Sequence, residues 1–433
     1  MKIQINHIGK MEGHADFVGE ILRGDVKSAK FITTEGARLI EGILVGRHYS
    51  EAPIITARIC GICPVVHKLS SIKAIENAFE ITPTAQAEEL RKIMNYAQLI
   101  HSHALHLFFL SLPDFFGIEN DLKFIKKYPK ETECAIRTRQ WALKIIEVIG
   151  GRAVHPIACE VGGFKTLPEK VELENLTSQY EKTLKDALCL VNLVINIKYP
   201  KFKRKTTFVS LENKKEYAYY GGDIKITNPD LSIDNIKAKN YTKNVKEIEE
   251  PYRASKSATL DGEPFMVGAI ARMNNNHDQL NPLANGLLRG LGWKFPQLNS
   301  FENISSQAIE IVHAMEEVNK LMKKLLKNYN PEEESVAQKY GVIASANPLG
   351  KEVTGIDAIE APRGTLYHHY SIDKNGYITD CSIITPTVCY LRNIEADVAE
   401  YIPNLNKLSD KQRSIKIRAL IRAYDPCIAC ATH

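Results

Sequence analysis

The sequence predicts a mostly α, α+β protein: a bundle of long helices with small antiparallel sheets at the N-terminus and the periphery. Three observations support this class. Apolar residues recur with helical period through much of 51–205 and again over 303–328. Residues 1–35 alternate apolar and polar side chains, as half-buried strands do. Between 206 and 270, short strand-like stretches are separated by glycine and Asn-Pro turns.

The first part of the chain, residues 1–50, should form a small sheet followed by a helix. Its three strands are "KIQINHI", "ADFVGEIL" and "VKSAKFITT", and Gly24-Asp25 is a turn between the second and third. The stretch "ARLIEGILVG" then predicts a helix that ends at Gly46.

Residues 51–205 are predicted to be a helical core that carries the first pair of cysteines. The stretch "VVHKLSSIKAIENAFEI" has helical period and is ended by Pro83. Residues 84–112 follow as one long helix with few polar interruptions, so we expect it to be buried on most sides. "TRQWALKIIEVIG" and residues 168–197 supply further helices.

Residues 206–300 form a strand-rich peripheral region, with strands at "TTFVSL", "EYAYYG", "DIKITN" and "EPFMVGAIA" and a loop at "NNNH" (274–277). The last part, 301–433, returns to helix over 303–328. A hairpin follows in "TLYHHYSIDKNGYITDCSIITP", whose Asn-Gly pair is a strong turn signal. Helices near 390–400 and 410–422 precede the final motif. We expect the four parts to act as one functional unit.

The composition is that of an ordinary globular protein. Of the 433 residues, 44% are hydrophobic and 25% charged, and the formal net charge is +5. Charges of both signs are dispersed, which argues against nucleic acid as a partner. The longest apolar run, "ALHLFFLSL", is too short to span a bilayer. The N-terminus has no apolar signal core, which indicates a cytoplasmic location unless a folded partner carries the chain across a membrane.

The cysteines carry the strongest chemical signal. Four of the nine form two C-x-x-C pairs at opposite ends of the chain, Cys60/Cys63 and Cys427/Cys430. The spacing alone leaves a structural zinc site, an iron–sulfur cluster and a thiolate-bound transition metal all open. The other five stand singly and are predicted to be small core residues: Cys134, Cys159, Cys189, Cys381 and Cys389.

The surroundings of the two pairs narrow these alternatives. In "RICGICPVVH" a glycine between the cysteines allows a tight backbone turn around an ion. In "DPCIACATH" a proline fixes the backbone before the first cysteine. A metal held between both pairs would also order the C-terminus, which otherwise tends to fray.

These two motifs resemble the signature motifs of the large, catalytic subunit of nickel–iron hydrogenases. The resemblance continues in "KMEGHADF", "IEGILVGR", "HPIACEVGGF", "EAPRGTLYHHY" and "RNIEADV", and the wording of "ICGIC" and "RAYDPC" is most similar to the soluble, multimeric cytoplasmic branch. It implies the large-subunit fold and the reversible heterolytic cleavage of dihydrogen into protons and electrons. It also implies that His433 is the residue after which the family's C-terminal extension is removed.

The resemblance assigns a metal role to each paired cysteine. Cys60 and Cys427 would be terminal nickel ligands, and Cys63 and Cys430 would bridge nickel and iron. The iron would carry carbon monoxide and cyanide ligands. Thiolates are soft, strong donors that suit such a site, and they bind deprotonated.

The resemblance also implies residues that act on the substrate side of this centre. Glu12 would take the proton from a terminal cysteine, which a carboxylate can do once burial raises its pKa. Lys10 stands where the family usually has arginine. Arg363 would lie over the open metal position, held there by Asp114 and Asp425, because a buried guanidinium needs such partners.

Three further residues are expected around the metal ligands. His67 resembles the histidine that bonds a bridging sulfur, Thr387 the residue that donates to a cyanide, and Pro362 precedes the arginine in its motif. Cys389 and Tyr390 replace the more polar residues usual after the threonine, so the outer pocket should differ from that of the family.

A second cation site is implied near the C-terminus. Glu41, His433 and the backbone carbonyl of Ile383 would bind Mg²⁺, or Fe²⁺ as in some members. Oxygen-rich ligation completed by water suits magnesium.

Electrons need a way out of a buried centre, and the single cysteines show no cluster spacing. A separate iron–sulfur small subunit is therefore implied, with further electron-transfer subunits. We interpret His101, His103 and His106 as packing or partner-interface residues. The alternative functions are a zinc-stabilised scaffold and a metal-free structural subunit of a redox complex.

Overall fold

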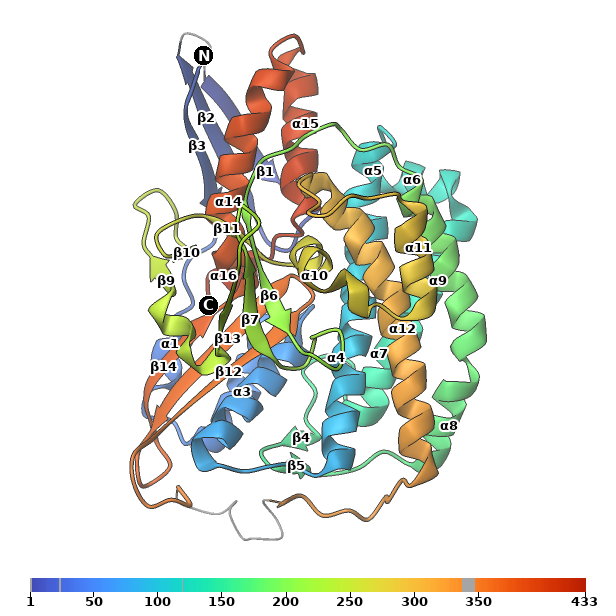
Figure 1. The fold of residues 1–433 in the computed structure, drawn as a ribbon, viewed down its shortest axis with the longest axis vertical. Helices are drawn as coiled ribbons and strands as arrows, with labels where there is room; N and C mark the ends of the chain where they lie inside the picture. The colour runs from blue at the N-terminus through green and yellow to red at the C-terminus, as the bar shows by residue number, and fades with distance from the viewer. Residues whose placement is uncertain (1, 23–24, 119, 337–346) are drawn as a thin grey trace.

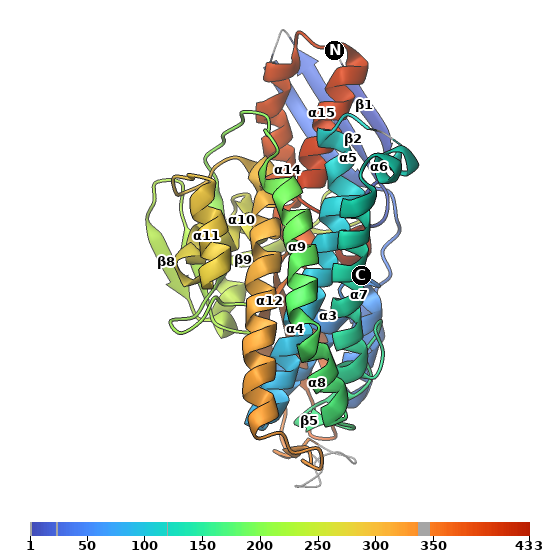
Figure 2. The ribbon, with the colours of Figure 1, turned by 90° about the vertical axis from the view of Figure 1, so that its right-hand side faces the viewer.

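The computed structural model describes residues 2–22, 25–118, 120–336 and 347–433. Long helices run side by side along its length (Figures 1 and 2). At the centre, α4 packs against α7 and α12, and α9 lies against both α7 and α12. The bounds of the bundle helices are α4 Ala85–Leu105, α7 Pro129–Gly150, α8 Lys170–Ser178, α9 Tyr180–Ile195 and α12 Asn303–Lys327. The predicted mostly α, α+β class with a long-helix bundle is confirmed.

A three-stranded antiparallel sheet lies beside the bundle and supports helix α3 (Pro64–Phe79). Its strands are β12 Val353–Ala361, β13 Gly364–Ile372 and β14 Ile378–Ile384, in that order. The predicted hairpin is β13–β14, whereas β12 was not predicted. A Cβ on Gly355 would lie 1.9 Å from the Ala74 carbonyl oxygen, so only glycine permits this close contact between β12 and α3.

The predicted N-terminal sheet is confirmed, with antiparallel strands β1 Lys2–Ile8, β2 Ala15–Leu22 and β3 Asp25–Thr33. The expected turn at Gly24-Asp25 lies partly outside the described residues. β3 packs on helix α14 (Pro386–Tyr401). Helix α15 (Asp410–Ala423) contacts β1, and it begins with a capping box between Ser409 and Gln412.

Two predicted helices differ in extent. The helix expected over 37–46 is the single turn α1, Ile40–Leu44, because Leu39 adopts a left-handed conformation (φ 56°) that cannot continue a helix. The helix expected over 84–112 becomes π-helical over His106–Ser111 before α5 (Leu112–Phe115). Pro113 has no N–H to donate to the preceding turn, which favours such a break.

The peripheral sheet corrects part of the prediction. Its order is β11–β6–β7–β8, and β11 is parallel to β6 rather than antiparallel. The bounds are β6 Thr207–Glu212, β7 Asp223–Thr227, β8 Ile233–Ile236 and β11 Phe265–Met266. The strand expected in "EYAYYG" is absent from that described segment, where the buried rings of Tyr217, Tyr219 and Tyr220 pack inward from an irregular backbone.

Two predictions are wrong here: the loop expected at 274–277 and the continuation of a strand beyond Met266. Helix α10 spans Ala269–Asn276, and His277 opens a 3-10 turn. The buried amide of Asn276 donates to the Leu211 carbonyl at 2.8 Å, which ties α10 to β6.

The remaining elements are short: α2 Ala52–Thr56, β4 Cys159–Glu160, β5 Gly163–Phe164, α6 Asp121–Lys127, β9 Val245–Ile248, β10 Ser257–Leu260, α11 Pro282–Gly290 and α16 Ile428–Ala431. None of the helices formed by the described residues has the length and apolarity needed to cross a bilayer. The C-terminal residues 427–432 are largely buried, and α16 packs against α14.

Candidate metal centre

Four cysteine sulfurs from the two ends of the chain meet in one buried cluster. The Sγ–Sγ distance is 3.5 Å between Cys60 and Cys427, 3.3 Å between Cys63 and Cys430, and 2.8 Å between Cys427 and Cys430. All four sulfurs lie within 4.8 Å of one another, and none forms a disulfide. Because thiolates this close repel one another in a buried site, the arrangement is suited to a bound metal.

Local structure positions each pair. Cys60 follows a 3-10 turn, and Cys63 is the N-cap of α3, whose first residue is Pro64. Cys427 is the N-cap of α16, and Cys430 lies within that short helix. Each pair therefore lies where a loop enters a helix.

Segments from much of the chain hold the C-terminal pair in place. Ile428 N–H donates to the Glu12 carbonyl at 2.9 Å, next to a parallel bridge between Glu12 and Cys427. Arg38 N–H donates to the Thr432 carbonyl at 2.8 Å, and Thr385 Oγ1 donates to the Cys430 carbonyl at 2.9 Å. The end of the chain is thus ordered by backbone contacts as well as by the sulfur cluster.

The carboxylate of Glu12 touches the cluster directly. Its Oε2 accepts from the Cys427 thiol at 3.2 Å and from Ala429 N–H at 2.8 Å. Burial raises the pKa of Glu12, and negative charge on Cys60 raises it further. A carboxylate in this position can exchange a proton with the Cys427 sulfur.

His67 and Thr387 lie around the C-terminal pair. His67 Nε2 is 3.7 Å from the Cys430 sulfur, and burial lowers the pKa of His67 to about 3, so its ring is neutral. Thr387 Oγ1 accepts from Cys427 N–H at 3.2 Å and lies 3.2 Å from the Tyr390 hydroxyl. The two side chains therefore contact one sulfur and the backbone of another ligand.

Arg363 occupies the two-residue turn between β12 and β13 and is buried beside the sulfurs. Its Nε donates to the Asp425 carbonyl at 2.8 Å, and its Nη2 pairs with Asp425 Oδ1 at 2.9 Å. Asp425 precedes Cys427 by two residues, so this pair joins the arginine turn to the C-terminal motif.

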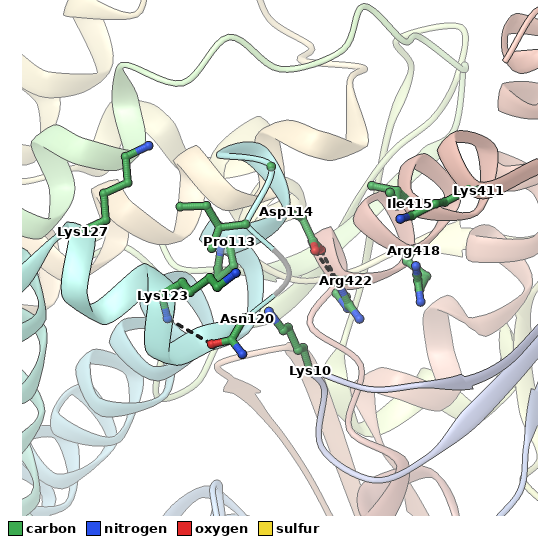
Figure 3. Close-up of a pocket in the computed structure, with 12 residues that line it drawn as sticks. Lys10, Pro113, Asp114, Asn120, Lys123, Lys127, Lys411, Ile415, Arg418 and Arg422 are labelled. Atoms are coloured by element: carbon green, nitrogen blue, oxygen red, sulfur yellow. Dashed lines mark hydrogen bonds and ion pairs between the residues drawn. The ribbon is translucent and has the colours of Figure 1, made fainter. Parts of the chain in front are cut away.

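Asp114 was expected beside Arg363, and the structure places it elsewhere. Both of its carboxylate oxygens accept from Arg422, at 2.6 and 2.8 Å (Figure 3). Arg422 also donates to the Gly9 carbonyl at 2.8 Å. Since both oxygens are used by Arg422, the expected contact with Arg363 is replaced by an ion pair between α5 and α15.

A buried charge cluster behind Arg363 was not predicted. The guanidinium of Arg272 on α10 donates to the Ala361 carbonyl at 3.0 Å and the Pro362 carbonyl at 2.9 Å. Glu310 and Glu360 hold this guanidinium at 2.7 to 2.8 Å. All three charged side chains are almost wholly inaccessible to solvent. The cluster therefore fixes the two carbonyls that precede Arg363.

The one sequence signal for this cluster is an arginine within the apolar stretch "AIARMN", a stretch whose pattern favours a strand and loop. The histidines of "HSHALH" contribute to the same interior. His103 Nε2 lies 2.9 Å from Glu310 Oε2, and His106 bonds Gln307 and the Arg422 carbonyl. Together with the burial of His101, this supports their interpretation as packing residues.

Glu41, Ile383 and His433 also come together, near the end of the chain. His433 Nε2 is 2.8 Å from the Ile383 carbonyl oxygen, and Glu41 Oε1 accepts from Ile383 N–H at 2.7 Å. Lys256 Nζ lies 3.2 Å from Glu41 Oε2 and 2.8 Å from Glu247 Oε2. The set offers a carboxylate, an imidazole and a carbonyl with one net negative charge, which fits a hydrated divalent cation.

Buried cysteine sulfurs from two C-x-x-C pairs, with a carboxylate in contact, define the class as a protein with a cysteine-ligated transition-metal site. The model of the nickel-dependent hydrogenase family matches residues 38–135 and 171–433. The alpha subunit of sulfhydrogenase 1 from Pyrococcus furiosus is 31% identical, over 100% of this chain and 98% of that protein. The beta subunit of the NAD-reducing hydrogenase HoxS from Cupriavidus necator is 27% identical, over 100% of this chain and 94% of that protein.

Solved structures agree. An NAD⁺-reducing [NiFe]-hydrogenase in the H₂-reduced state superposes with a TM-score of 0.86 at 25% identity, covering 100% of this chain and 99% of that one. The reduced Ni-Fe-Se hydrogenase of D. vulgaris Hildenborough, at 22% identity, shares the fold with a TM-score of 0.78 and complete coverage of both chains.

This chain belongs to the nickel-dependent hydrogenase family. It is a hydrogenase catalytic subunit, an oxidoreductase acting on hydrogen, and its four clustered cysteines fit a Ni-Fe site. The resemblance found in the sequence is confirmed, and the zinc-scaffold and metal-free alternatives are set aside. The relatives are named subunits of multi-subunit enzymes, so partner subunits are expected.

The Arg272 cluster generates a prediction with a matched control. Arg272→Lys keeps the positive charge but cannot form both hydrogen bonds to the Ala361 and Pro362 carbonyls at the Arg363 turn. Arg91→Lys disrupts a comparable pair, since Arg91 is fully buried and bonds both oxygens of Glu76 at 2.7 and 2.9 Å. Both variants should lose about 1–3 kcal/mol of stability.

Only Arg272→Lys should slow dihydrogen–deuterium exchange, by about tenfold or more, because small displacements of an active-site group are costly. Thermal unfolding, metal content and exchange are measured on both variants. Equal exchange rates in the two would show that Arg272 stabilises the fold without positioning Arg363.

Proposed function

We propose that this subunit splits dihydrogen heterolytically at a Ni-Fe centre whose iron carries carbon monoxide and cyanide. The observation that carries the proposal is the buried four-sulfur cluster with Glu12 in contact with one sulfur. Cys60 and Cys427 would be the terminal nickel ligands, and Cys63 and Cys430 the bridging ones. When bound, the centre supplies the Lewis acidity that polarises dihydrogen.

The chain's own residues then handle the proton. The Cys427 sulfur holds it first and passes it to Glu12 Oε2 across the 3.2 Å hydrogen bond. Ala429 N–H orients the same oxygen, so the acceptor is fixed before the proton arrives. Because Glu12 lies on the loop between β1 and β2, it can pass the proton toward the surface.

Arg363 is proposed to present its guanidinium to the reacting side of the sulfur cluster. Asp425 orients it through two contacts, and the β12–β13 turn with Pro362 fixes where its side chain begins. His67 would donate to the Cys430 sulfur, and Thr387 would offer its hydroxyl to a ligand of the iron. These groups are fixed by their neighbours and need little rearrangement during turnover.

A divalent cation, Mg²⁺ or Fe²⁺, is proposed at Glu41, His433 and the Ile383 carbonyl. The net negative charge of the Glu41, Glu247 and Lys256 group supports a cation there, and water would complete its shell. Such an ion would join α1, β14 and the last residue, and so hold the C-terminal motif closed over the cysteines.

An iron–sulfur small subunit is proposed to dock on an apolar face beside the first cysteine pair, with further electron-transfer subunits beyond it. We define the docking face by exposed apolar side chains on α1, α2 and the 152–157 loop: Leu39, Ile43, Ile54, Val154 and Ile157. α1 contacts α2, and His155 Nδ1 bonds the Ala57 carbonyl at 2.8 Å, three residues before Cys60. We propose that the four parts of the chain, 1–50, 51–205, 206–300 and 301–433, act as one functional unit. We also propose that the assembled complex is cytoplasmic.

The docking face can be tested in the assembled enzyme. Ile54→Asp combined with Ile157→Asp should release the small subunit, because charges at the centre of an apolar interface are strongly unfavourable. Leu231→Asp with Ile233→Asp is the matched control, since these side chains are similarly exposed (59% and 56%) on the peripheral region. Size-exclusion chromatography of the co-expressed complex reports assembly. A complex that survives the first pair of changes, or dissociates with the second, would contradict this assignment.

The proton route is tested by two substitutions that should fail differently. Glu12→Gln keeps the shape and removes the acceptor, so both metals should remain while turnover and isotope exchange fall by roughly 10²–10⁴-fold. Arg363→Lys keeps the charge but loses the fork of donors. It should also retain the metals and slow turnover, with the proton route through Glu12 still open.

Metal content, turnover and exchange are measured on both variants. Wild-type exchange in Glu12→Gln would remove Glu12 from the proton route and leave it as a residue that only fixes the Cys427 backbone.

A further inference from the structure

A basic cavity of about 830 Å³ lies between α6 and α15, outside the metal centre. Among the described residues, its lining includes one carboxylate, that of Asp114, and six cations: Lys10, Lys123, Lys127, Lys411, Arg418 and Arg422. Figure 3 shows the α6 lysines on one side of the hollow and the α15 side chains on the other. The excess of five positive charges equals the formal net charge of the whole chain, +5. The remaining charges of the protein therefore balance.

The charges in this cavity are only partly neutralised from within. Asp114 is fully engaged by Arg422, and Lys10 pairs with Asp121 at 2.6 Å. No carboxylate of the described residues lies within ion-pairing distance of the other four cations, on α6 and α15. Like charges that face one hollow repel each other, so this arrangement costs stability unless an anion occupies the cavity.

One face of helix α15 lines the cavity. Lys411, Ile415, Arg418 and Arg422 recur at intervals of four, three and four residues, which places them on one face. Like charges four residues apart weaken a helix by a few tenths of a kcal/mol. Apolar surface from Pro113, Ile118 and Ile415 lies among these cations.

We propose that the cavity binds a small polyanion, a molecule with two or more adjacent phosphate groups. Cations from three separate segments converge on one hollow, instead of forming the extended stripe that suits a long acidic peptide. The volume lies within the range of small-molecule sites, and the apolar wall provides a contact for an organic portion of the ligand. Lysine and arginine together supply the point charges and forked donors that phosphates require.

The bound polyanion would lie against segments that lead to the metal centre. Lys10 precedes Glu12 by two residues, and Arg422 precedes Cys427 by five. Arg422 Nε also bonds the Gly9 carbonyl, so the two segments are joined at the cavity wall. The site is nevertheless separate from the sulfur cluster, and its test does not depend on hydrogenase activity.

Calorimetric titration of the purified, metal-loaded protein tests this proposal with defined probes: inorganic phosphate, pyrophosphate, tripolyphosphate and a glutamate octapeptide. We expect one pyrophosphate per chain, tighter binding of tripolyphosphate, weaker binding of phosphate, and affinity that falls with added salt. Two cavity variants, Lys123→Glu/Lys127→Glu and Lys411→Glu/Arg418→Glu, should each weaken pyrophosphate binding by at least about tenfold.

The matched control is Lys214→Glu/Lys239→Glu, which reverses two exposed charges in the peripheral region and should leave binding unchanged. The α6 pair lies on a short surface helix, so it remains informative if the α15 pair folds poorly. Pyrophosphate binding that is equal in all variants, or undetectable in the wild type at low salt, would overturn the proposal. Tighter binding of the glutamate peptide than of tripolyphosphate would overturn it in favour of an acidic protein segment.

Discussion

The structure depends on bringing four cysteine sulfurs from opposite ends of the chain within 4.8 Å of one another in a buried site. In a low-dielectric interior, several thiolates cannot remain this close without a cation, so metal binding and closure of the C-terminal segment are coupled. The N-terminal loop at Glu12, Arg38 before α1 and Thr385 before α14 all bond backbone atoms of the C-terminal cysteine motif. The fold brings the chain ends together, and the metal would offset the repulsion that results.

Different sides of the sulfur cluster are bordered by different groups. On one side, the Glu12 carboxylate is hydrogen-bonded to the Cys427 sulfur, where we propose that it accepts the proton. On another, the segment before Cys60 borders the apolar face on which we propose that the small subunit docks. Arg363 is held from two directions, by Asp425 on the C-terminal motif and by the Arg272 cluster behind its turn. Because Arg272 on α10 and Glu310 on α12 are buried and paired, this support holds the guanidinium of Arg363 in one place.

Much of the site could be predicted because many of its residues lie in short sequence motifs. The members of each cysteine pair, Asp425 and His433 lie within a few residues of another site residue, and Glu12 lies in the short motif "KMEGH", so local sequence identifies them. The predicted contact between Asp114 and Arg363 was wrong, because Asp114 pairs with Arg422, which is more than three hundred residues away in sequence. Arg272 was missed for the same reason: its partners Glu310 and Glu360 lie far apart along the chain.

In the fold, too, features set by local sequence were predicted, and features set by distant contacts were not. Long periodic segments such as 303–328 and the alternating N-terminal strands were predicted, because their own pattern requires one buried face. "EYAYYG" has the composition of a strand, yet its tyrosines are buried by packing against the bundle. Among the residues that the structure describes, its backbone forms no strand ladder, although the Tyr219 carbonyl accepts one bond from Glu360 N–H at 3.1 Å. β12 carries Gly355, Asp357 and Glu360, which are unusual strand residues, and it is stabilised by α3 and buried ion pairs that the sequence does not reveal.

Metal analysis combined with infrared spectroscopy of the purified complex tests the central claim most directly. The proposed Ni-Fe centre predicts nickel and non-cluster iron in about a one-to-one ratio, with absorption bands of metal-bound carbon monoxide and cyanide. Zinc in place of nickel, or the absence of those bands in a preparation that turns over dihydrogen, would contradict the account.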